Sequence, residues 1–200
     1  MSARTFSSSL LVLFALADAG CFGSSPAARF YTLSTLSPRE GQGGGGGGHG
    51  VRVRVAPVTV PEGVDRPQMV RRTGENTVVV DEYDRWVEPL DALLRHTLVL
   101  DLGALLPEAQ VLGDAIPGLA ADRTVVVAMN RLELSGQLVM DAVWFVLPAG
   151  ADQPERTHRT RLTEPAGSGG PADLAPALSR AMEKLSREIA AELAPTEKPR

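Results

Sequence analysis

The chain has 200 residues, a net charge of −4 at neutral pH and a pI near 5.4. This acidic balance argues against a protein that binds nucleic acid non-specifically. Beyond the N-terminal region no apolar run approaches the roughly 18 residues of a transmembrane helix. A single cysteine, Cys21, leaves no partner for an internal disulfide.

The first 21 residues follow the order of a secretory signal. Arg4 gives a basic start, and residues 10–17 form an apolar run that is too short to cross a bilayer. Ala19-Gly20-Cys21 then resembles the lipobox of bacterial lipoproteins, in which small residues precede a cysteine that takes a diacylglycerol. Asp18 stands where such boxes usually carry Leu. We therefore predict a signal peptide over residues 1–20 and lipidation of Cys21.

Lipidation of Cys21 predicts a mature protein that works at a membrane surface. The alternative is a free thiol within an uncleaved or ordinary signal peptide. Phe22 follows the cysteine, at the position where an Asp retains many lipoproteins in the inner membrane. We therefore expect a lipoprotein of the cell envelope that is anchored in the outer membrane and faces the periplasm.

Residues 21–50 are expected to form a lipidated tether. Within them, residues 29–33 predict a short strand that joins the domain, and the six glycines 43–48 predict a flexible surface loop. A phosphate-binding loop would need a preceding strand and a Lys-Ser or Lys-Thr after the glycines, and the sequence has neither. Nucleotide binding is therefore not expected here.

Residues 51–194 are predicted to form one α+β domain, followed by a disordered tail over residues 195–200. Alternating Val and Arg at 51–55 predict a strand, which Pro57 makes either an edge strand or one that ends early. Glu88-Pro89 opens a helix whose leucines share one face. Further strands are expected at 69–72 and 77–80 (a hairpin), 110–112, 123–134, 137–147 and 158–163, and a second helix at 173–193.

This order of elements predicts an antiparallel or mixed β-sheet with two α-helices packed on one face. Asp101 falls on the apolar stripe of the first helix. We interpret it as a helix-end residue or as a carboxylate satisfied by a neighbouring backbone group, rather than as a catalytic residue.

No catalytic or metal-binding pattern is apparent. His49, His96 and His158 share no ligand spacing, there are no cysteine pairs for zinc, and no Gly-x-Ser-x-Gly elbow is present. We therefore expect a non-enzymatic protein without metal or cofactor. The alternative is an envelope enzyme whose site is assembled from residues distant in the sequence.

Residues 81–90 are the densest unusual segment. They contain Tyr83, Arg85 and Trp86, and Tyr, Arg and Trp dominate the hot spots of protein interfaces. The alternative is that Trp86 fills the core beneath the helix start while Arg85 pairs with Asp84 or Glu88.

Four segments together resemble the PqiC family of auxiliary lipoproteins of ABC-type intermembrane transport systems. They are Tyr31-Thr32-Leu33, Asp65-Arg66-Pro67-Gln68-Met69-Val70, the Thr-Gly-x-Asn turn at 73–76, and Tyr83-Asp84-Arg85-Trp86-Val87-Glu88-Pro89-Leu90. The resemblance is strong over residues 51–106. The glycine run departs from the family pattern and lengthens a loop.

The resemblance implies a non-enzymatic auxiliary subunit of an ABC/MCE-type (mammalian cell entry) lipid transport system. Such a lipoprotein would sit in the outer membrane and dock a periplasm-spanning MCE-domain protein, with ATP hydrolysis in another subunit. The alternative is an independent envelope lipoprotein that binds lipid directly, in which the apolar run 143–147 would line a cavity. Self-association into a homo-oligomer is compatible with a transport conduit, and no residue of the sequence decides it.

The segments that carry the resemblance also supply the candidate site. The partner-binding residues are predicted to be Asp65, Arg66, Pro67, Arg71, Tyr83, Arg85, Trp86 and Glu88. The membrane is expected to be reached through the lipid on Cys21.

Overall fold

The computed structural model describes residues 26–37 and 50–194, and within these ranges the chain forms eight strands and two helices. In chain order they are β1 Arg29–Tyr31, β2 Arg52–Val55, β3 Gln68–Gly74, β4 Thr77–Trp86, α2 Leu90–Leu105, β5 Gln110–Leu112, β6 Arg123–Leu134, β7 Gln137–Pro148, β8 His158–Pro165 and α3 Pro171–Leu193. The predicted signal peptide, Cys21, the glycine run and the tail lie outside the described residues.

A five-stranded mixed sheet forms the larger layer of the fold, in the order β5-β2-β6-β7-β8. β2 runs parallel to both of its neighbours, and β6, β7 and β8 follow as an antiparallel meander. Ser135-Gly136, between the predicted strands 123–134 and 137–147, joins β6 to β7. Of the two outcomes expected at Pro57, the strand ends early, at Val55, and it lies inside the sheet rather than at its edge.

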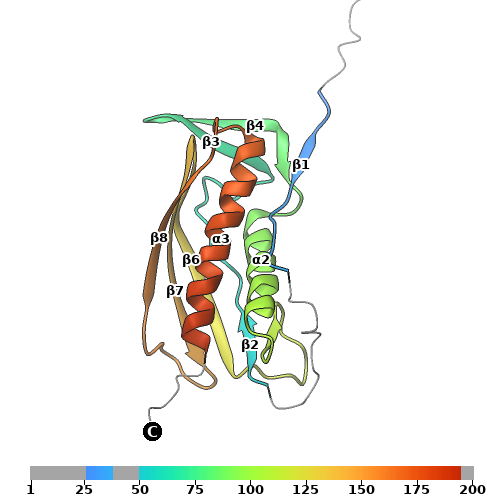
Figure 1. Cartoon of the computed structure of the whole chain (residues 1–200), viewed down its shortest axis with the longest axis vertical. Helices are drawn as coiled ribbons and strands as arrows, with labels where there is room; N and C mark the ends of the chain where they lie inside the picture. The colour runs from blue at the N-terminus through green and yellow to red at the C-terminus, as the bar shows by residue number, and fades with distance from the viewer. Residues whose placement is uncertain (1–25, 38–49, 195–200) are drawn as a thin grey trace, which may run out of the picture.

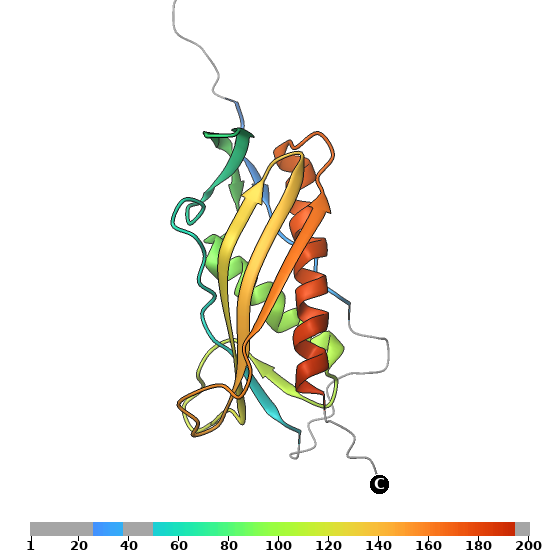
Figure 2. The ribbon, with the colours of Figure 1, turned by 90° about the vertical axis from the view of Figure 1, so that its left-hand side faces the viewer.

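Both helices cover the same face of this sheet, as Figures 1 and 2 show. α3 packs on β7 and β8, while α2 packs on β2, β5 and α3. The buried apolar residues of each helix recur every three or four residues, so they form one stripe that enters the core. The predicted α+β class, with two helices on one face of a mixed sheet, is confirmed.

A second, smaller sheet was not predicted. β3 and β4 form the expected hairpin, but together with β1 they build a separate three-stranded sheet in the order β1-β4-β3. β4 continues to Trp86, well past the predicted end at residue 80, and its register with β3 shifts between Gln68 and Met69. β1 pairs in parallel with the part of β4 beyond this irregularity, at one end of the larger sheet (Figure 1).

The apolar run 143–147 lies within β7. Trp144 is buried, stacks on His158 with ring centroids 4.2 Å apart, and donates its indole N–H to Thr160 Oγ1 at 3.0 Å. Val143 and Phe145, its neighbours in the strand, are half-buried. This alternation is typical of a strand in a sheet that carries helices on one face.

Buried carboxylates of the sheet are paired with cations. Asp141 on β7 accepts hydrogen bonds from Arg159 and Arg161 on β8, and these bonds hold the pKa of its carboxyl well below the ordinary range. Glu164 on β8 accepts from Arg180 and Lys184 of α3. The ion pairs of Glu164 connect α3 to β8, the edge strand of the sheet.

Candidate functional site: the end of the domain that follows the anchor

A side-chain clasp fixes β1 to β4. Arg29 Nε and Nη2 donate to the two carboxylate oxygens of Asp84 at 2.7 and 2.9 Å, and the Tyr31 hydroxyl donates to Asp84 Oδ1 at 2.8 Å. The bidentate bond from Arg29 holds the pKa of the Asp84 carboxyl below its ordinary value, although burial acts in the opposite direction. The segment that follows the predicted anchor is therefore bound to the motif residues of β4.

Beyond β1 the chain passes between α2 and α3. Leu33 is buried in the core, and the next backbone groups are capped by helix side chains. The Ser34 N–H donates to Ser179 Oγ at 3.0 Å, and the Leu36 N–H donates to Asp101 Oδ1 at 2.8 Å. The segment thus behaves as an integral part of the fold, with side-chain acceptors in place of a neighbouring strand.

Asp101 is the buried carboxylate that the sequence placed on the apolar stripe of α2. It is 1% exposed, and its second oxygen accepts a hydrogen bond from Ser186 Oγ of α3 at 3.0 Å. The interpretation as a carboxylate satisfied by a neighbouring backbone group is confirmed by its bond to Leu36. Burial raises the pKa of the Asp101 carboxyl, because the charged form loses hydration.

Asp101→Ala is expected to lower the free energy of unfolding by about 1–3 kcal/mol, because it leaves the Leu36 N–H and the Ser186 hydroxyl without their acceptor. Asp101→Asn keeps the acceptor oxygen for Leu36 and is the matched control. Urea unfolding measures both variants. Equal stability of Asp101→Ala and wild type would show that this contact contributes nothing to stability.

The Asp101→Asn variant also isolates how the titration of Asp101 changes the free energy of unfolding with pH. The folded protein holds the Asp101 proton more tightly than the unfolded chain. Its contribution to the free energy of unfolding therefore falls as pH rises from the ordinary value of 3.8 through the raised pKa of the folded state. Asn does not titrate, so Asp101→Asn should lack this pH-dependent contribution to the free energy of unfolding. At pH values above the raised pKa of Asp101, the variant should be at least as stable as wild type.

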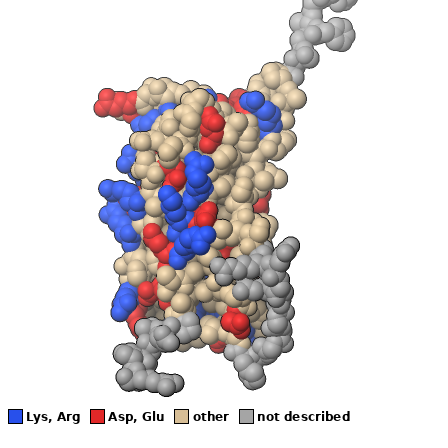
Figure 3. Space-filling model, in the orientation of Figure 1, with Lys and Arg blue, Asp and Glu red and all other residues tan. Residues whose placement is uncertain are grey.

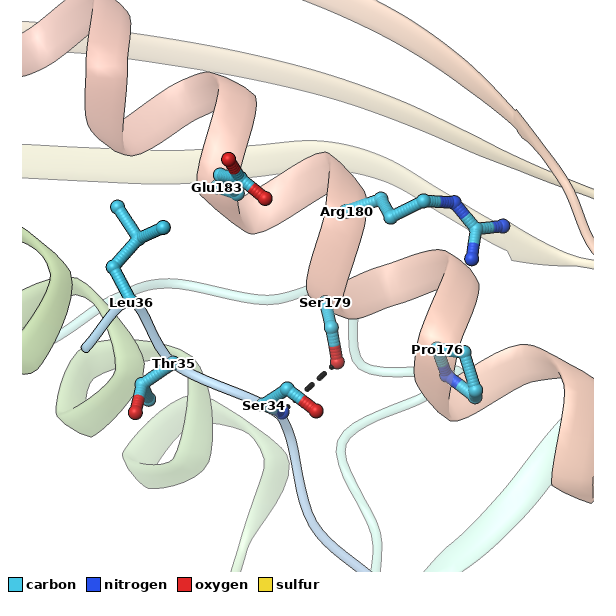
Figure 4. A pocket seen from close by; sticks show the side chains of 7 residues that line it. All are labelled: Ser34, Thr35, Leu36, Pro176, Ser179, Arg180 and Glu183. Atoms are coloured by element: carbon cyan, nitrogen blue, oxygen red, sulfur yellow. Dashed lines mark hydrogen bonds between the residues drawn. The ribbon is translucent and has the colours of Figure 1, made fainter.

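A recess of about 240 Å³ opens beside the Ser34–Leu36 segment, against Pro176, Ser179 and Glu183 of α3 (Figure 4). Ligand pockets for small molecules are typically about 300–1,000 Å³, and an intact phospholipid needs more room still. This recess is therefore too small to hold an intact phospholipid.

The loop before β3 presents three of the predicted partner-binding residues. Asp65, Arg66 and Pro67 are all exposed. The Pro67 carbonyl accepts a hydrogen bond from the Trp86 N–H at 2.8 Å, and Gln68 pairs with Arg85 across β3 and β4. The loop therefore lies beside the end of β4, as the two motifs require if they form one site.

Two members of the predicted set are fixed by contacts within the fold: Trp86 is buried and Arg71 is half-buried. Trp86 is 3% exposed and fills the core beneath the start of α2, which is the alternative that the sequence left open. Arg71 donates to Asp81 at 2.5 Å and to the Gly169 carbonyl at 3.3 Å, so it links the hairpin to the loop before α3. These two residues support the predicted partner-binding surface from within the fold and are not part of its exposed face.

The remaining members lie at or near the surface. Tyr83 is 43% exposed, and Arg85 and Glu88 are half-buried. The expected pairing of Arg85 with Asp84 or Glu88 is wrong: Arg85 Nε donates to the Glu82 carbonyl at 3.0 Å, because Asp84 is taken by Arg29. Glu88 lies 3.6 Å from His96 Nδ1.

Sequence reasoning missed three residues that hold the segment after the anchor or its acceptor Asp101: Arg29, Ser179 and Ser186. Arg29 stands two positions before Tyr31, and its charge was the only available signal. Ser179 and Ser186 lie on the apolar face of α3, seven positions apart, which is about two helical turns. Polar residues at two core positions of one helix predict a buried acceptor or donor opposite them, and this pattern was the signal available for the serines.

The outward face of α3 carries charges of both signs, interleaved along the helix (Figure 3). Arg187 pairs with Glu183 one turn away, at 2.8 Å. No cluster of three or more His, Cys, Asp or Glu is placed to hold a metal ion within residues 26–37 and 50–194. In the same ranges, neither helix is long and apolar enough to cross a membrane.

Comparison with known proteins gives consistent matches. A curated relative, the intermembrane transport lipoprotein PqiC of Escherichia coli (strain K12), is 25% identical over 137 residues, which are 68% of this chain and 72% of the relative. A crystal structure of an uncharacterized protein matches with a TM-score of 0.68 at 22% identity, covering 84% of this chain and all of the other. Protein XCC0632 from Xanthomonas campestris matches with a TM-score of 0.67 at 14% identity, covering 83% of this chain and 94% of the other.

The two solved structures share the fold. The family is shown by the match of residues 31–190 to the family model of the ABC-type transport auxiliary lipoprotein component, because this range runs from β1 into the last turns of α3. The chain therefore belongs to the family of ABC-type transport auxiliary lipoprotein components.

Proposed function

We propose that this protein is the outer-membrane subunit of an ABC/MCE-type intermembrane lipid transport system. Diacylglycerol on Cys21 anchors it, the domain faces the periplasm, and the domain docks a periplasm-spanning MCE-domain partner without catalysing a reaction. The name of the curated relative, an intermembrane transport lipoprotein, supports transport between membranes.

The observation that carries this proposal is the integration of the post-anchor segment into the fold. Only eight positions separate Cys21 from Arg29, so β1 stays within about 29 Å of the anchor whatever conformation the intervening chain adopts. From Arg29 to Leu36 the chain is bonded to β4, α2 and α3. The domain is thereby held close to the membrane, where an adaptor for the end of a periplasm-spanning partner is needed.

We further propose that the partner docks on the exposed part of the motif. Arg66 and Pro67 lie beside Arg85 through the pairing of β3 with β4, and Tyr83 precedes Arg85 on the same strand. Asp65 and Glu88 flank this group with negative charge. The surface therefore combines a Tyr and two Arg, residue types enriched at protein interfaces, with two carboxylates at its rim.

Charge reversal at Arg66 or Arg85 is expected to weaken partner binding at least about tenfold, roughly 1.4 kcal/mol, because a cation facing the partner becomes an anion. The measurement is the Kd of the lipidated protein for its MCE-domain partner, for wild type, Arg66→Glu and Arg85→Glu. Arg156→Glu, at an exposed arginine in the loop between β7 and β8, is the matched control.

All four proteins should show the same thermal melting temperature, which separates loss of contact from loss of fold. Wild-type affinity in both Arg66→Glu and Arg85→Glu would contradict the proposed docking surface and leave the motif with a structural role only.

A further inference from the structure

We propose that the face of the five-stranded sheet opposite the helices, here called the open face, binds an acidic amphipathic helix of a partner protein. Apolar side chains of that helix lie on β6 and β7, and its carboxylates bind arginines at both ends of the face. This inference requires neither the anchoring at Cys21 nor the proposed docking surface around Arg66 and Arg85.

The register of β6 and β7 defines an apolar band on the open face. Val126 lies opposite Phe145, and Ala128 lies opposite Val143, so each pair shares one side of the sheet. Leu147 follows Phe145 by two positions in β7 and therefore points to the same side. All five side chains are half-buried, whereas the residues that alternate with them belong to the core or pack against it. Both helices lie on the other side of the sheet, so they leave this band uncovered (Figures 1 and 2).

Arginines stand at both ends of the apolar band. At one end Arg54 of β2 lies beside Thr124 of β6, which lies beside Leu147 of β7. At the other end Asp141 of β7 lies beside Arg161 of β8. The two ends are six positions apart along β7, which is about 20 Å. A helix of roughly 13 residues has this length, so its two ends would reach both groups of arginines.

The arginines on β8 carry more positive charge than their partner neutralises. Arg159 and Arg161 both pair with Asp141, and their side chains are 62% and 65% exposed. Each arginine donates to Asp141 through Nε and Nη2, which leaves the N–H groups of Nη1 for another acceptor. Asp141 therefore holds two guanidinium groups in place, and together the three groups form a cationic site that favours a carboxylate.

The same surplus recurs elsewhere on the open face. Glu133 of β6 pairs with both Arg131 and Arg72. Arg54 donates to an uncharged acceptor, the Thr124 hydroxyl, and no carboxylate among the described residues pairs with it. The whole chain has a net charge of −4, so this excess of arginine is local to the open face. Basic side chains also gather along β8 in the space-filling view (Figure 3).

The shape of the open face favours a protein helix over a bilayer as its occupant. The apolar side chains of the band are half-buried among their neighbours, so they do not project far enough to enter an acyl layer. A helix can instead pack flat along the strands, as α3 packs on β7 and β8 from the opposite side. An apolar centre with arginines at its rim is also the usual composition of a protein interface.

The test is photo-crosslinking of the full chain in intact cells, with benzoylphenylalanine in place of Phe145 and mass spectrometry of the cross-linked peptide. Leu147 is a second insertion point in the band. The control position is Leu100, which is 45% exposed on α2 and thus lies in the opposite layer.

Charge-neutral variants separate the role of the arginines from the role of the fold. Arg54→Gln and Arg159→Gln each remove one cation of the open face, and Asp141 keeps Arg161 in the second variant. Arg187→Gln is the matched control, since Arg187 is an exposed arginine of α3 that pairs with Glu183. All variants should have the thermal melting temperature of the wild type.

We expect position 145 to give a protein adduct whose cross-linked peptide carries carboxylates on both sides of an apolar run, and position 100 to give none. The yield should fall at least about threefold in Arg54→Gln and in Arg159→Gln, because each variant lacks a charge-assisted contact, and it should be unchanged in Arg187→Gln.

Several results would overturn the inference. One is a folded protein that gives no adduct at either position 145 or position 147. Others are an adduct with lipid alone, with a second copy of this chain, or with a peptide that lacks carboxylates. An unchanged yield in both Arg54→Gln and Arg159→Gln would also overturn it, because the arginines would then contribute nothing to binding.

Discussion

Trp86→Ala is expected to lower the free energy of unfolding by about 3–5 kcal/mol. Trp86 is 3% exposed, follows the clasp residue Asp84 on β4 and lies in the same buried cluster as Leu90 at the start of α2. Its removal leaves a cavity where β1, β4 and α2 meet. Since domains of this size are stable by about 5–15 kcal/mol, the variant should show a large shift of its urea unfolding midpoint.

Val87→Ala is the matched control for this prediction. Val87 is the next residue and is 56% exposed, so its truncation should change stability by less than about 0.5 kcal/mol. If Trp86→Ala were as stable as Val87→Ala but failed to bind the MCE-domain partner, the side chain would be a contact residue and its core role would be contradicted.

Cys21→Ser is expected to abolish acylation and to move the protein from the membrane pellet to the soluble fraction. Stable anchoring by lipid needs about two acyl chains, which a diacylglycerol on one thiol supplies in a single step. Cys21 is the only cysteine of the chain, so no other thiol can take the label. Metabolic labelling with an alkyne fatty acid, followed by fractionation, measures the effect.

Asp18→Leu is the informative companion variant, because it restores the residue usual at that lipobox position. It should be labelled at least as well as wild type. Persistent labelling of Cys21→Ser would place the acyl group elsewhere and would contradict the anchor.

Sequence periodicity predicted most of the secondary structure. The leucine stripe of α2, the long apolar face of α3 and the alternation at 51–55 are each set by burial of one face. The hairpin around Gly74 follows from local turn chemistry between two β-rich runs. These signals act within a few residues, so they can be followed along the chain without knowledge of the tertiary structure.

The separate three-stranded sheet could not be predicted in the same way. It depends on a register shift in β4 and on a parallel pairing of Arg29 with Asp84, 55 positions away in the sequence. Sequence pattern specifies which residues prefer an extended backbone, and it does not specify which distant strand they join. The caps that Ser179 and Asp101 provide for Ser34 and Leu36 depend on the same tertiary arrangement.

The candidate site was predicted as a set of residues, and the structure divides that set by burial and by contacts within the fold. Trp86 and Arg71 face packed neighbours, while Arg66 and Tyr83 reach the surface. A motif of Trp, Tyr and Arg fits a buried core and an interface equally well, because both need large, well-packed side chains. Only the three-dimensional structure separates the residues that support the surface from those that form it.

The most direct test of the account is photo-crosslinking in intact cells, with a photoreactive residue in place of Arg66, followed by affinity purification and mass spectrometry. We expect a cross-link to an MCE-domain protein, and we expect it to be lost when the photoreactive residue replaces Arg156 instead. Recovery of no MCE-domain protein, together with lipid bound to the purified domain, would contradict the docking role and favour an independent lipid-binding lipoprotein.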